Sequence, residues 1–396
     1  MLTVSERGDL FKRILALTII LLLILTEVHF SFSLRTGSKV GTSKTIYAIE
    51  EPTQRKSFYA SGLFWVFYSD GTNMVYSTSG DGNNWTSPTI VRECSAGYRF
   101  SVFFDNTYIH YACVQIFLNT SLLYRRGIPR YNSTISWSAE EQVAVPGEIN
   151  IRYRDPMIAV DSSGYALICY KRNNNSDSTT YPWITKSGNN NGTWGITPHL
   201  FPYQLNNILS RVSWNYIITP LTDNKFYITY GVSNAKLYGR LYDNGMREEE
   251  TVTSNTLGQS WQHSTTNEGD HVHLVYKKRV SHELIYVNRT FGSGWGIEEE
   301  FQLATESYVS PVLSIHTSSG DLYCFWIRTN GHVYYKKRSG GIWDVSPTIW
   351  FDESFNSVTG VEKISCFYRD NGGKIGCIFM TNTISPYEIH FGFINL

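Results

Sequence analysis

Three arginines stand out in this sequence as side chains whose type and position suit joint chemistry. Arg99, Arg154 and Arg211 each stand just before the same strand in three successive repeats. If their side chains converge, their guanidinium groups can hold a carboxylate through paired, charge-assisted hydrogen bonds. The alternative interpretation is three separate loop arginines that bond to backbone carbonyls or face water.

Asp155 and Glu362 are the acidic candidates. Two carboxyl groups roughly 5 to 10 Å apart can hydrolyse a glycosidic bond, one of them acting as the acid. The competing interpretation pairs each carboxylate with a neighbouring cation, Arg154 for Asp155 and Lys363 for Glu362.

Further side chains are expected at the same end of the repeated strands as the three arginines. They are Trp214, Gln262, His263, Tyr308 and Ser310. Arginines, an aromatic platform and acids together suit a glycan, in particular an acidic sugar. The sequence has no phosphate-binding loop, dinucleotide fingerprint, Cys-x-x-Cys pair or nucleophile elbow, so we expect no cofactor. His271 and His273 lack a third placed ligand, so we expect no metal.

The elements that must position these residues are short strands in repeated units. One unit runs from Leu63 to Val91 and recurs from Leu322 to Trp350. It consists of a strand, a turn, a second strand, a tryptophan and a Ser-Pro-Thr-Ile segment. The tryptophan occurs at Trp85, Trp137, Trp194, Trp295 and Trp343, with gaps of 52, 57, 101 and 48 residues. The gap of 101 residues corresponds to two repeats whose middle tryptophan is lost. A unit of about 50 residues is the length of a four-stranded propeller blade.

The repeats predict an all-β chain that forms a β-propeller of seven blades, each with four antiparallel strands. The innermost strands are expected to start near Lys56, Arg99, Asp155, Ser213, Trp261, Val309 and Val361. Six blades are the alternative, because the first inner strand, Ser57 to Ala60, is short. The last unit offers only three strands, and we expect residues 45–50 to supply the fourth and close the ring.

Two turns carry a resemblance to a known family. Residues 79–85, with Ser79, Asp81 and Trp85, resemble a shortened Asp-box, the turn motif of sialidase-like propellers with bacterial neuraminidase repeats. Residues 187–194, with Ser187, Asn189 and Trp194, are similar to the full-length motif. Residues 290–295 and 339–343 look like degenerate copies. The resemblance implies a structural role, in which the Ser and Asp side chains bind the amides of the turn while the tryptophan packs between sheets.

A second, local likeness concerns the segment around Arg154. Tyr153-Arg154-Asp155-Pro156 is similar to the sialidase Tyr-Arg-Ile-Pro segment, whose arginine helps to bind a substrate carboxylate. Here Asp155 replaces the apolar residue, and the segment lies in the third unit rather than near the start. A sialidase-like site also needs a Tyr/Glu nucleophile pair and an acidic Asp, and the sequence shows no anchored match for either.

The N-terminal segment predicts export. Arg7, Lys12 and Arg13 precede an apolar run from Ile14 to Leu25, so residues 1–33 are expected to be a signal peptide or an uncleaved membrane anchor. We expect residues 40–396 to form the propeller, extracellular or at the cell surface, with membrane contact only through the leader. The chain has 34 basic and 34 acidic residues, so the charge excess of a nucleic-acid binder is missing.

The six cysteines leave two interpretations open. If Asn371-Gly372 forms a two-residue hairpin turn, Cys366 and Cys377 face each other and a disulfide is possible. The alternative is buried free thiols in strands.

Together these observations favour an exported surface propeller that binds a glycan or a cell-surface protein at its channel face without catalysis. The alternative is a divergent sialidase-like glycoside hydrolase that acts on an acidic sugar and uses the three arginines as its anion clamp.

Overall fold

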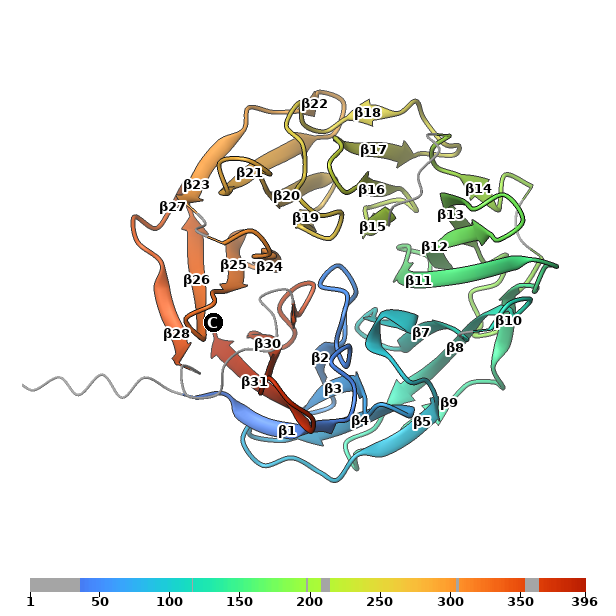
Figure 1. Ribbon diagram of the computed structural model, residues 1–396, viewed down its shortest axis with the longest axis horizontal. Coiled ribbons are helices and arrows are strands. Elements are labelled where there is room, and N and C mark those ends of the chain that lie inside the picture. The colour runs from blue at the N-terminus through green and yellow to red at the C-terminus, as the bar shows by residue number, and fades with distance from the viewer. Residues whose placement is uncertain (1–35, 116, 197–198, 208–213, 304–305, 353–362) are drawn as a thin grey trace, which may run out of the picture. The chain divides into compact units, whose positions relative to one another are not determined.

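The computed structural model describes residues 36–396 except residues 116, 197–198, 208–213, 304–305 and 353–362. Within these residues, which form one compact unit, seven antiparallel sheets stand around a central axis as the blades of a β-propeller (Figure 1). The predicted all-β, seven-blade fold is confirmed. The six-blade alternative is wrong, because the short strand β2 (Ser57–Ala60) is the inner strand of a complete four-stranded blade.

The first four blades each run from an innermost strand outward. Blade 1 consists of β2, β3 (Leu63–Ser69), β4 (Asn73–Ser79) and β5 (Thr89–Glu93). Blade 2 consists of β6 (Phe100–Phe104), β7 (Ile109–Val114), β8 (Leu122–Pro129) and β10 (Gln142–Val145), with β9 (Ile135–Trp137) also on β8. Blade 3 consists of β11 (Ile151–Val160), β12 (Ala166–Asn174), β13 (Thr179–Lys186) and β14 (Tyr203–Gln204). Blade 4 consists of β15 (Trp214–Pro220), β16 (Phe226–Val232), β17 (Leu237–Tyr242) and β18 (Glu250–Thr251).

The last three blades follow the same order. Blade 5 consists of β19 (His263–Glu268), β20 (His271–Lys277) and β21 (Glu283–Thr290), with β22 (Gly294–Trp295) and β23 (Glu299–Leu303) both on β21. Blade 6 consists of β24 (Val312–His316), β25 (Asp321–Ile327) and β26 (His332–Ser339), with β27 (Ile342–Trp343) and β28 (Thr348–Asp352) both on β26. Blade 7 consists of β29 (Ile364–Cys366), β30 (Lys374–Thr381), β31 (Tyr387–Asn395) and β1 (Ser38–Ser43).

Most of the recurring tryptophans pack a blade onto the one before it. Trp85 lies edge-on to Phe391 of blade 7, with ring centroids 5.1 Å apart. The rings of Trp194, Trp295 and Trp343 likewise contact Tyr124, Tyr227 and Tyr286 of the preceding blades at 5.2, 5.6 and 5.8 Å. Edge-to-face aromatic pairs at such distances stabilise a contact beyond the area that they bury. Four of the five tryptophans therefore mark contacts between blades, whereas the Trp137 ring contacts Tyr111 of its own blade at 5.5 Å.

The ring is closed by a strand from the N-terminal side of the propeller. β1 pairs with β31, from Ser38 opposite Phe391 to Ser43 opposite Tyr387. The expectation of a closing strand is thus confirmed, but its position at residues 45–50 is wrong. Gly41 lets the strand pass Tyr68, whose hydroxyl would lie 2.1 Å from a Cβ at this position. Residues 45–50 instead lead from the rim toward the central channel.

The segment from Glu50 to Lys56 fills the channel from one end. Arg55 is buried, and its guanidinium donates hydrogen bonds to the carbonyl oxygens of three inner strands: Thr265 (2.8 Å), Leu313 (3.4 Å) and Cys366 (3.3 Å). Gln54 donates to the carbonyl oxygens of Tyr98 and Pro156. Inner strands present unpaired carbonyls to the channel, and a guanidinium with five donors satisfies several of them at once.

Two ionisable groups of this segment are buried, and burial shifts their pKa values in opposite senses. It raises the pKa of Glu51 from its ordinary 4.5 to about 8, and it lowers the pKa of Lys56 from 10.5 to about 7. Asn215 donates to the Glu51 carboxyl group at 3.0 Å, and Lys56 donates to the Gln54 side chain at 2.7 Å.

These shifts make a prediction about pH. Between about pH 4.5 and 7 the folded state keeps a proton on Glu51 that the unfolded chain releases, so Glu51 should make the free energy of unfolding fall as pH rises. Above about pH 7 the folded state loses the proton of Lys56 that the unfolded chain keeps, which offsets this fall. The variant Glu51→Gln should lack the fall due to Glu51. Its free energy of unfolding, relative to that of the wild type, should therefore rise by up to about 1.4 kcal/mol per pH unit between about pH 4.5 and 7. Urea unfolding at several pH values measures the difference. The control Glu140→Gln, at an exposed glutamate, should run parallel to the wild type.

The cysteine register is confirmed, but the turn expected at Asn371-Gly372 is not. Asn371 and Lys374 are bonded through their backbones, so the two-residue turn is Gly372-Gly373. Cys366 lies directly opposite Cys377 in the β29–β30 hairpin. Both are buried free thiols, as are the other four cysteines, so the thiol interpretation holds in this structure and the disulfide does not.

The predicted leader, residues 1–33, lies outside the described residues. In the part of the chain that the structure describes, no helix has the length and apolar character needed to cross a membrane.

Candidate functional site

The chain enters each inner strand by a crossover from the preceding blade and leaves it by a hairpin to the second strand. Crossovers and hairpins therefore lie at opposite ends of the inner strands. We call these ends the crossover face and the hairpin face. Arg99 and Arg154 belong to the crossover face, because Arg99 directly precedes β6 and Arg154 lies in the first half of β11.

Two of the three predicted arginines line one small cavity on the crossover face. We call it the arginine cavity; its volume is about 110 Å³. Its lining residues are Tyr98, Arg99, Val114, Gln115, Arg152, Tyr153, Arg154 and Asp155. Arg211 and Glu362 lie outside the described residues. Arg152 was missed in the sequence, although it stands two residues before Arg154 and so shares its side of the strand.

The three guanidinium groups of the cavity have no ionic partner among the described carboxylates. Arg99 is only 9% exposed and donates to the Ser95 hydroxyl at 2.8 Å, with its guanidinium 5.5 Å from the centre of the Tyr98 ring. Arg154 is exposed, whereas Arg152 is half-buried and its Nε, itself buried, has no hydrogen-bond partner. A concentration of cations without counter-ions favours an anionic ligand.

Asp155 does not contribute a free acid. The register of β11 on β12 breaks between Arg154 and Met157, and Asp155 has a positive φ of 48°. This irregularity turns Arg154 outward while Asp155 is buried against Lys171, with which it forms an ion pair. The predicted ion pair between Asp155 and Arg154 is therefore wrong. A carboxylate paired with a buried lysine is poorly placed to donate or accept the proton of a glycosidic bond.

A tyrosine and a glutamate adjoin the cavity. The Tyr153 hydroxyl donates to Glu148 at 2.6 Å, and Arg172 binds both oxygens of the same carboxylate. Tyr153 is almost fully buried, and burial raises the pKa of its hydroxyl above the ordinary value. The hydrogen bond from Arg172 lowers the pKa of Glu148. A buried tyrosine that is harder to ionise does not fit a nucleophile.

Most of the other residues predicted at the mouth hold the crossovers together. Trp214 is fully buried in the core and offers no ring to a ligand. Gln262 is buried and donates to the carbonyls of Ser307 and Val309. His263 is buried beside the Ser260 carbonyl, and burial lowers its pKa to about 4.

The predictions of Trp214, Gln262 and His263 as ligand residues are therefore wrong. Gln262 and His263 instead bond to buried backbone carbonyls of the crossovers, whereas Trp214 packs in the hydrophobic core. Ser310 is also buried, whereas Tyr308 is 55% exposed but does not line the arginine cavity.

The turn at residues 79–85 has the geometry expected of its sequence. The Asp81 carboxylate accepts hydrogen bonds from the backbone N–H groups of Asn83 and Asn84 and from the Ser79 hydroxyl. The two backbone bonds hold the pKa of Asp81 below its ordinary value. Trp85 donates to the Ser38 hydroxyl at 3.0 Å and so ties the turn to the closing strand.

The turn at residues 187–194 is built differently. The Ser187 hydroxyl donates to the Asn189 carbonyl, and the Asn189 side chain donates to Thr193. Both turns lie at the rim of their blades and support the contact between blades rather than a ligand site.

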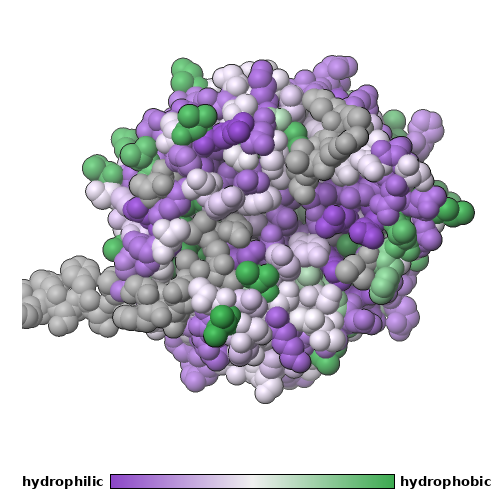
Figure 2. Space-filling model, in the orientation of Figure 1, coloured by the Kyte–Doolittle hydropathy of each residue, from purple (hydrophilic) through white to green (hydrophobic). Residues whose placement is uncertain are grey.

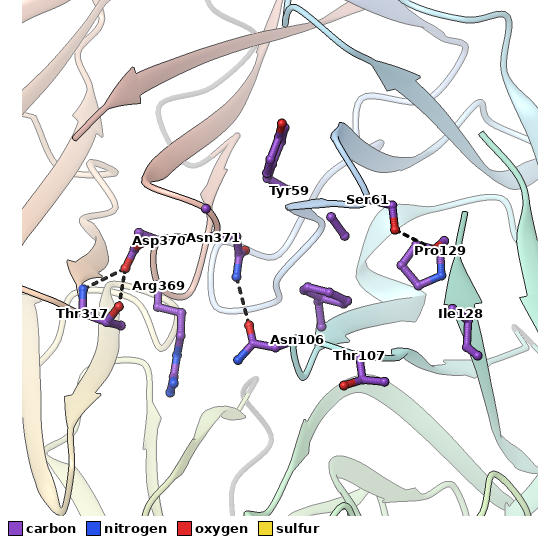
Figure 3. Close-up of a pocket in the computed structure, with 13 residues that line it drawn as sticks. Tyr59, Ser61, Asn106, Thr107, Ile128, Pro129, Thr317, Arg369, Asp370 and Asn371 are labelled. Carbon is purple, nitrogen blue, oxygen red and sulfur yellow. Dashed lines mark hydrogen bonds between the residues drawn. The ribbon is translucent and has the colours of Figure 1, made fainter. Parts of the chain in front are cut away.

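Two larger hollows lie on the hairpin face, and sequence reasoning missed them. One has a volume of about 570 Å³ and is shown in Figure 3; the other has a volume of about 590 Å³. They meet at four residues that line both: Phe104, Asn106, Thr107 and Arg369. The available signal was the run of polar turn residues at the same place in each repeat, such as Asn106-Thr107 and Asp370-Asn371. On the face seen in Figure 2, hydrophobic residues form small separate patches among hydrophilic ones.

Comparisons with known proteins agree with the fold. No family model matches the sequence, and no curated protein matches it. The polysaccharide lyase Uly1 is similar in structure, with a TM-score of 0.52 and 12% identity over 88% of this chain and 92% of that one. The Aleuria aurantia lectin bound to α-methyl-L-fucoside has a TM-score of 0.48 and 12% identity over 89% and 96% of the two chains. The α-L-arabinanase of Penicillium chrysogenum bound to arabinobiose has a TM-score of 0.47 and 12% identity over 74% and 93%. Of these three, the likeness to Uly1 alone has a TM-score above 0.5, and at 12% identity it concerns the fold alone.

Proposed function

We propose that this chain is an exported surface propeller that binds an acidic glycan at the arginine cavity without cleaving it. The observation that carries the proposal is the convergence of Arg99, Arg152 and Arg154 on one cavity without an ion pair to any described carboxylate. The one carboxylate among its described lining residues, Asp155, is already paired with Lys171. An entering anion thus meets uncompensated positive charge.

The size of the cavity supports recognition of a charged group rather than of a whole sugar. Its volume of about 110 Å³ corresponds to about four water molecules at roughly 30 Å³ each. A carboxylate or sulfate group fits such a space. The remainder of the ligand would extend outward past Arg154, which is exposed.

Binding without turnover is supported by the state of the acidic groups. Glycoside hydrolysis needs a proton donor and a second carboxylate or its equivalent at the scissile bond. Asp155 is bound to Lys171, and Glu148 is bound to Arg172 and Tyr153. Kinship with sialidase-like propellers belongs to the proposal as well. Its support is the Ser79–Trp85 turn and the Tyr153–Pro156 segment, and export is supported by the basic and apolar leader.

Calorimetric titration with acidic and neutral oligosaccharides tests this function. We expect sialyllactose, oligogalacturonate or a sulfated oligosaccharide to bind, and lactose not to bind at the arginine cavity. Arg99→Gln and Arg154→Gln should each weaken binding by about tenfold or more, because each removes a charge-assisted contact worth about 1.5–3 kcal/mol. Added salt should weaken binding further.

A matched control separates the cavity from net charge. Arg279 is an exposed arginine in the turn after β20, and Arg279→Gln should leave affinity unchanged. If all three variants lose affinity equally, the attraction is a general charge effect and the cavity is not the site. Turnover of fluorogenic sialosides or of a glycosidase substrate panel would reject the non-catalytic part of the proposal.

A further inference from the structure

The two hollows on the hairpin face have the dimensions of a ligand site. At about 570 and 590 Å³, each falls within the roughly 300–1,000 Å³ typical of ligand pockets. All seven blades contribute to their lining. The lining residues are 59–61, 103–108, 128–129, 160–162, 164, 220–223, 267, 269, 317 and 369–372. Because the hollows meet at Thr107 and Arg369, together they form an elongated groove that suits a chain better than a single ring.

The centre of the groove offers hydrogen-bond donors that the protein does not use. Arg369 lines both hollows and donates to Asn267 at 3.1 Å, with its guanidinium 5.2 Å from the centre of the Tyr368 ring. It forms no ion pair with any described carboxylate. In Figure 3 its side chain extends away from Asp370 and lies between Thr317 and Asn106. A guanidinium has five N–H donors, so several remain for a ligand.

The aspartates of the groove are acceptors whose charge is already balanced or hydrogen-bonded. Asp105 lies 3.0 Å from His110, and Asp161 lies 2.6 Å from Lys186. Asp370 accepts from the backbone N–H and the hydroxyl of Thr317, both at 2.7 Å. Carboxylates along the walls disfavour an anion, and their existing partners disfavour a metal cation. In the described residues no three His, Cys, Asp or Glu side chains are placed to hold a metal.

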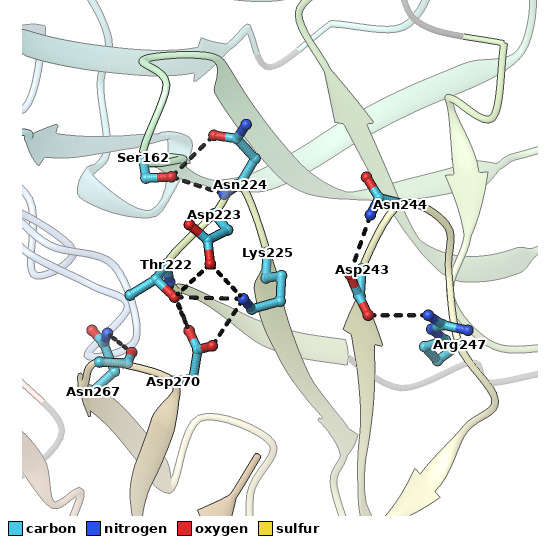
Figure 4. A network of polar contacts seen from close by, with 11 residues as sticks. Ser162, Thr222, Asp223, Asn224, Lys225, Asp243, Asn244, Arg247, Asn267 and Asp270 are labelled. Atoms are coloured by element: carbon cyan, nitrogen blue, oxygen red, sulfur yellow. Dashed lines mark hydrogen bonds and ion pairs between the residues drawn. The ribbon is translucent and has the colours of Figure 1, made fainter. Parts of the chain in front are cut away.

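The hairpins that form the groove are held to one another by side chains. Asp270 of blade 5 accepts two hydrogen bonds from Thr222 of blade 4 and forms an ion pair with Lys225 of the same blade 4 (Figure 4). On the other side of blade 4, the Ser162 hydroxyl of blade 3 donates to the Asn224 side chain. Because these contacts already fix the walls of the groove, a ligand that binds there causes little further loss of conformational entropy in the protein. Polar side chains and apolar ones such as Tyr59, Phe104 and Pro220 both line the groove. This mixture suits a sugar chain, whose rings present hydroxyl groups at their edges and apolar C–H faces to aromatic side chains.

We propose that the hairpin face is a second ligand site, which takes an uncharged saccharide chain, so that the propeller can hold two glycans on opposite faces. The site is independent of the arginine cavity. It would remain if binding of the acidic glycan were disproved.

Binding of neutral hexaoses tests this proposal. The panel is β-1,4-glucan, β-1,4-xylan, β-1,4-mannan, α-1,4-glucan and α-1,5-arabinan hexaose, titrated against the full chain by calorimetry. Thr107→Trp places a large ring where the two hollows meet and should abolish binding of the hexaose that the wild type binds. Arg369→Gln should weaken it by about tenfold, as expected for lost hydrogen bonds from a charged donor.

Thr72→Trp is the matched control. Thr72 and Thr107 are both exposed, and each donates its backbone N–H to the aspartate two residues earlier, but Thr72 lies in the turn after β3 at the other end of the blade. Thr72→Trp should leave hexaose binding unchanged, and so should Arg99→Gln. Equal thermal melts of the tryptophan variants check that both fold.

The outcomes separate the two faces. No binding of any hexaose by the wild type, or binding that Thr107→Trp leaves intact, overturns the hairpin-face site. If Thr107→Trp removes acidic and neutral ligands alike, one groove serves both, and the arginine cavity loses its proposed function.

Discussion

A chain that begins at Thr45 is expected to lose the propeller fold or to aggregate, whereas a chain that begins at Thr36 should fold. The shorter chain lacks β1, which supplies the outer strand of blade 7 and buries Val40 beside Ile389 and Phe391. Without β1, the edge of β31 is unpaired and its apolar side chains are uncovered, and an exposed edge of this kind promotes aggregation. We expect a fall in Tm of about 10 °C or more, since a loss of several kcal/mol corresponds to that shift in a large domain.

Two point variants in the closing strand refine this test. Val40 is buried and Thr42 is exposed in the same strand, so Val40→Lys should destabilise strongly and Thr42→Lys should not. Circular dichroism melts and size-exclusion chromatography measure both. If Val40→Lys melts with the wild type, the closing strand is not a principal source of stability.

Replacement of Arg55 by methionine is expected to cost about 3–6 kcal/mol of unfolding free energy, because it leaves buried carbonyl groups without a donor. Methionine keeps most of the apolar stem, so the loss would come from the hydrogen bonds to Thr265, Leu313 and Cys366. These carbonyls belong to blades 5, 6 and 7, while Arg55 itself precedes the inner strand of blade 1. A single side chain therefore joins four blades at the axis.

Urea unfolding measures this loss. Arg55→Lys should fall between the wild type and Arg55→Met, since lysine retains the charge but cannot reach several carbonyls with a rigid fork. The exposed arginine in Arg279→Met serves as the control and should change stability by less than about 0.5 kcal/mol. Equal stability of Arg55→Met and the wild type would mean that water replaces the guanidinium in the channel.

The filled channel changes where a ligand can bind. In the sequence the mouth of an open channel was the expected site, and the residues assigned to it included Trp214 and Gln262. The structure closes that mouth with residues 50–56 and buries both side chains. Ligand-sized space remains beside the channel, at the arginine cavity on the crossover face and at the hollows on the hairpin face.

Much of the fold was readable because each blade is local in sequence. A short hairpin keeps its two strands close to one register, so Cys366 and Cys377 face each other as the sequence predicts, although the turn lies one residue later than expected. The tryptophan spacing gave the repeat length, and the expected starts of the inner strands gave the count of seven, because the tryptophan is missing from the fourth and seventh units. The position of β1 was not readable, because it pairs with residues about 350 positions away and several polar segments near the N-terminus fit the role equally well.

By itself, then, the sequence determined the repeat length, favoured seven blades over six and gave Arg99 and Arg154 a shared position. Only the tertiary structure decided what those side chains face. Asp155 points inward to Lys171 because the register of its strand breaks there. Arg55 joins several blades at the axis because three strands distant in sequence present carbonyl groups to it. Spacing along the chain sets which end of a blade a residue occupies, whereas its partners depend on how seven separate sheets meet.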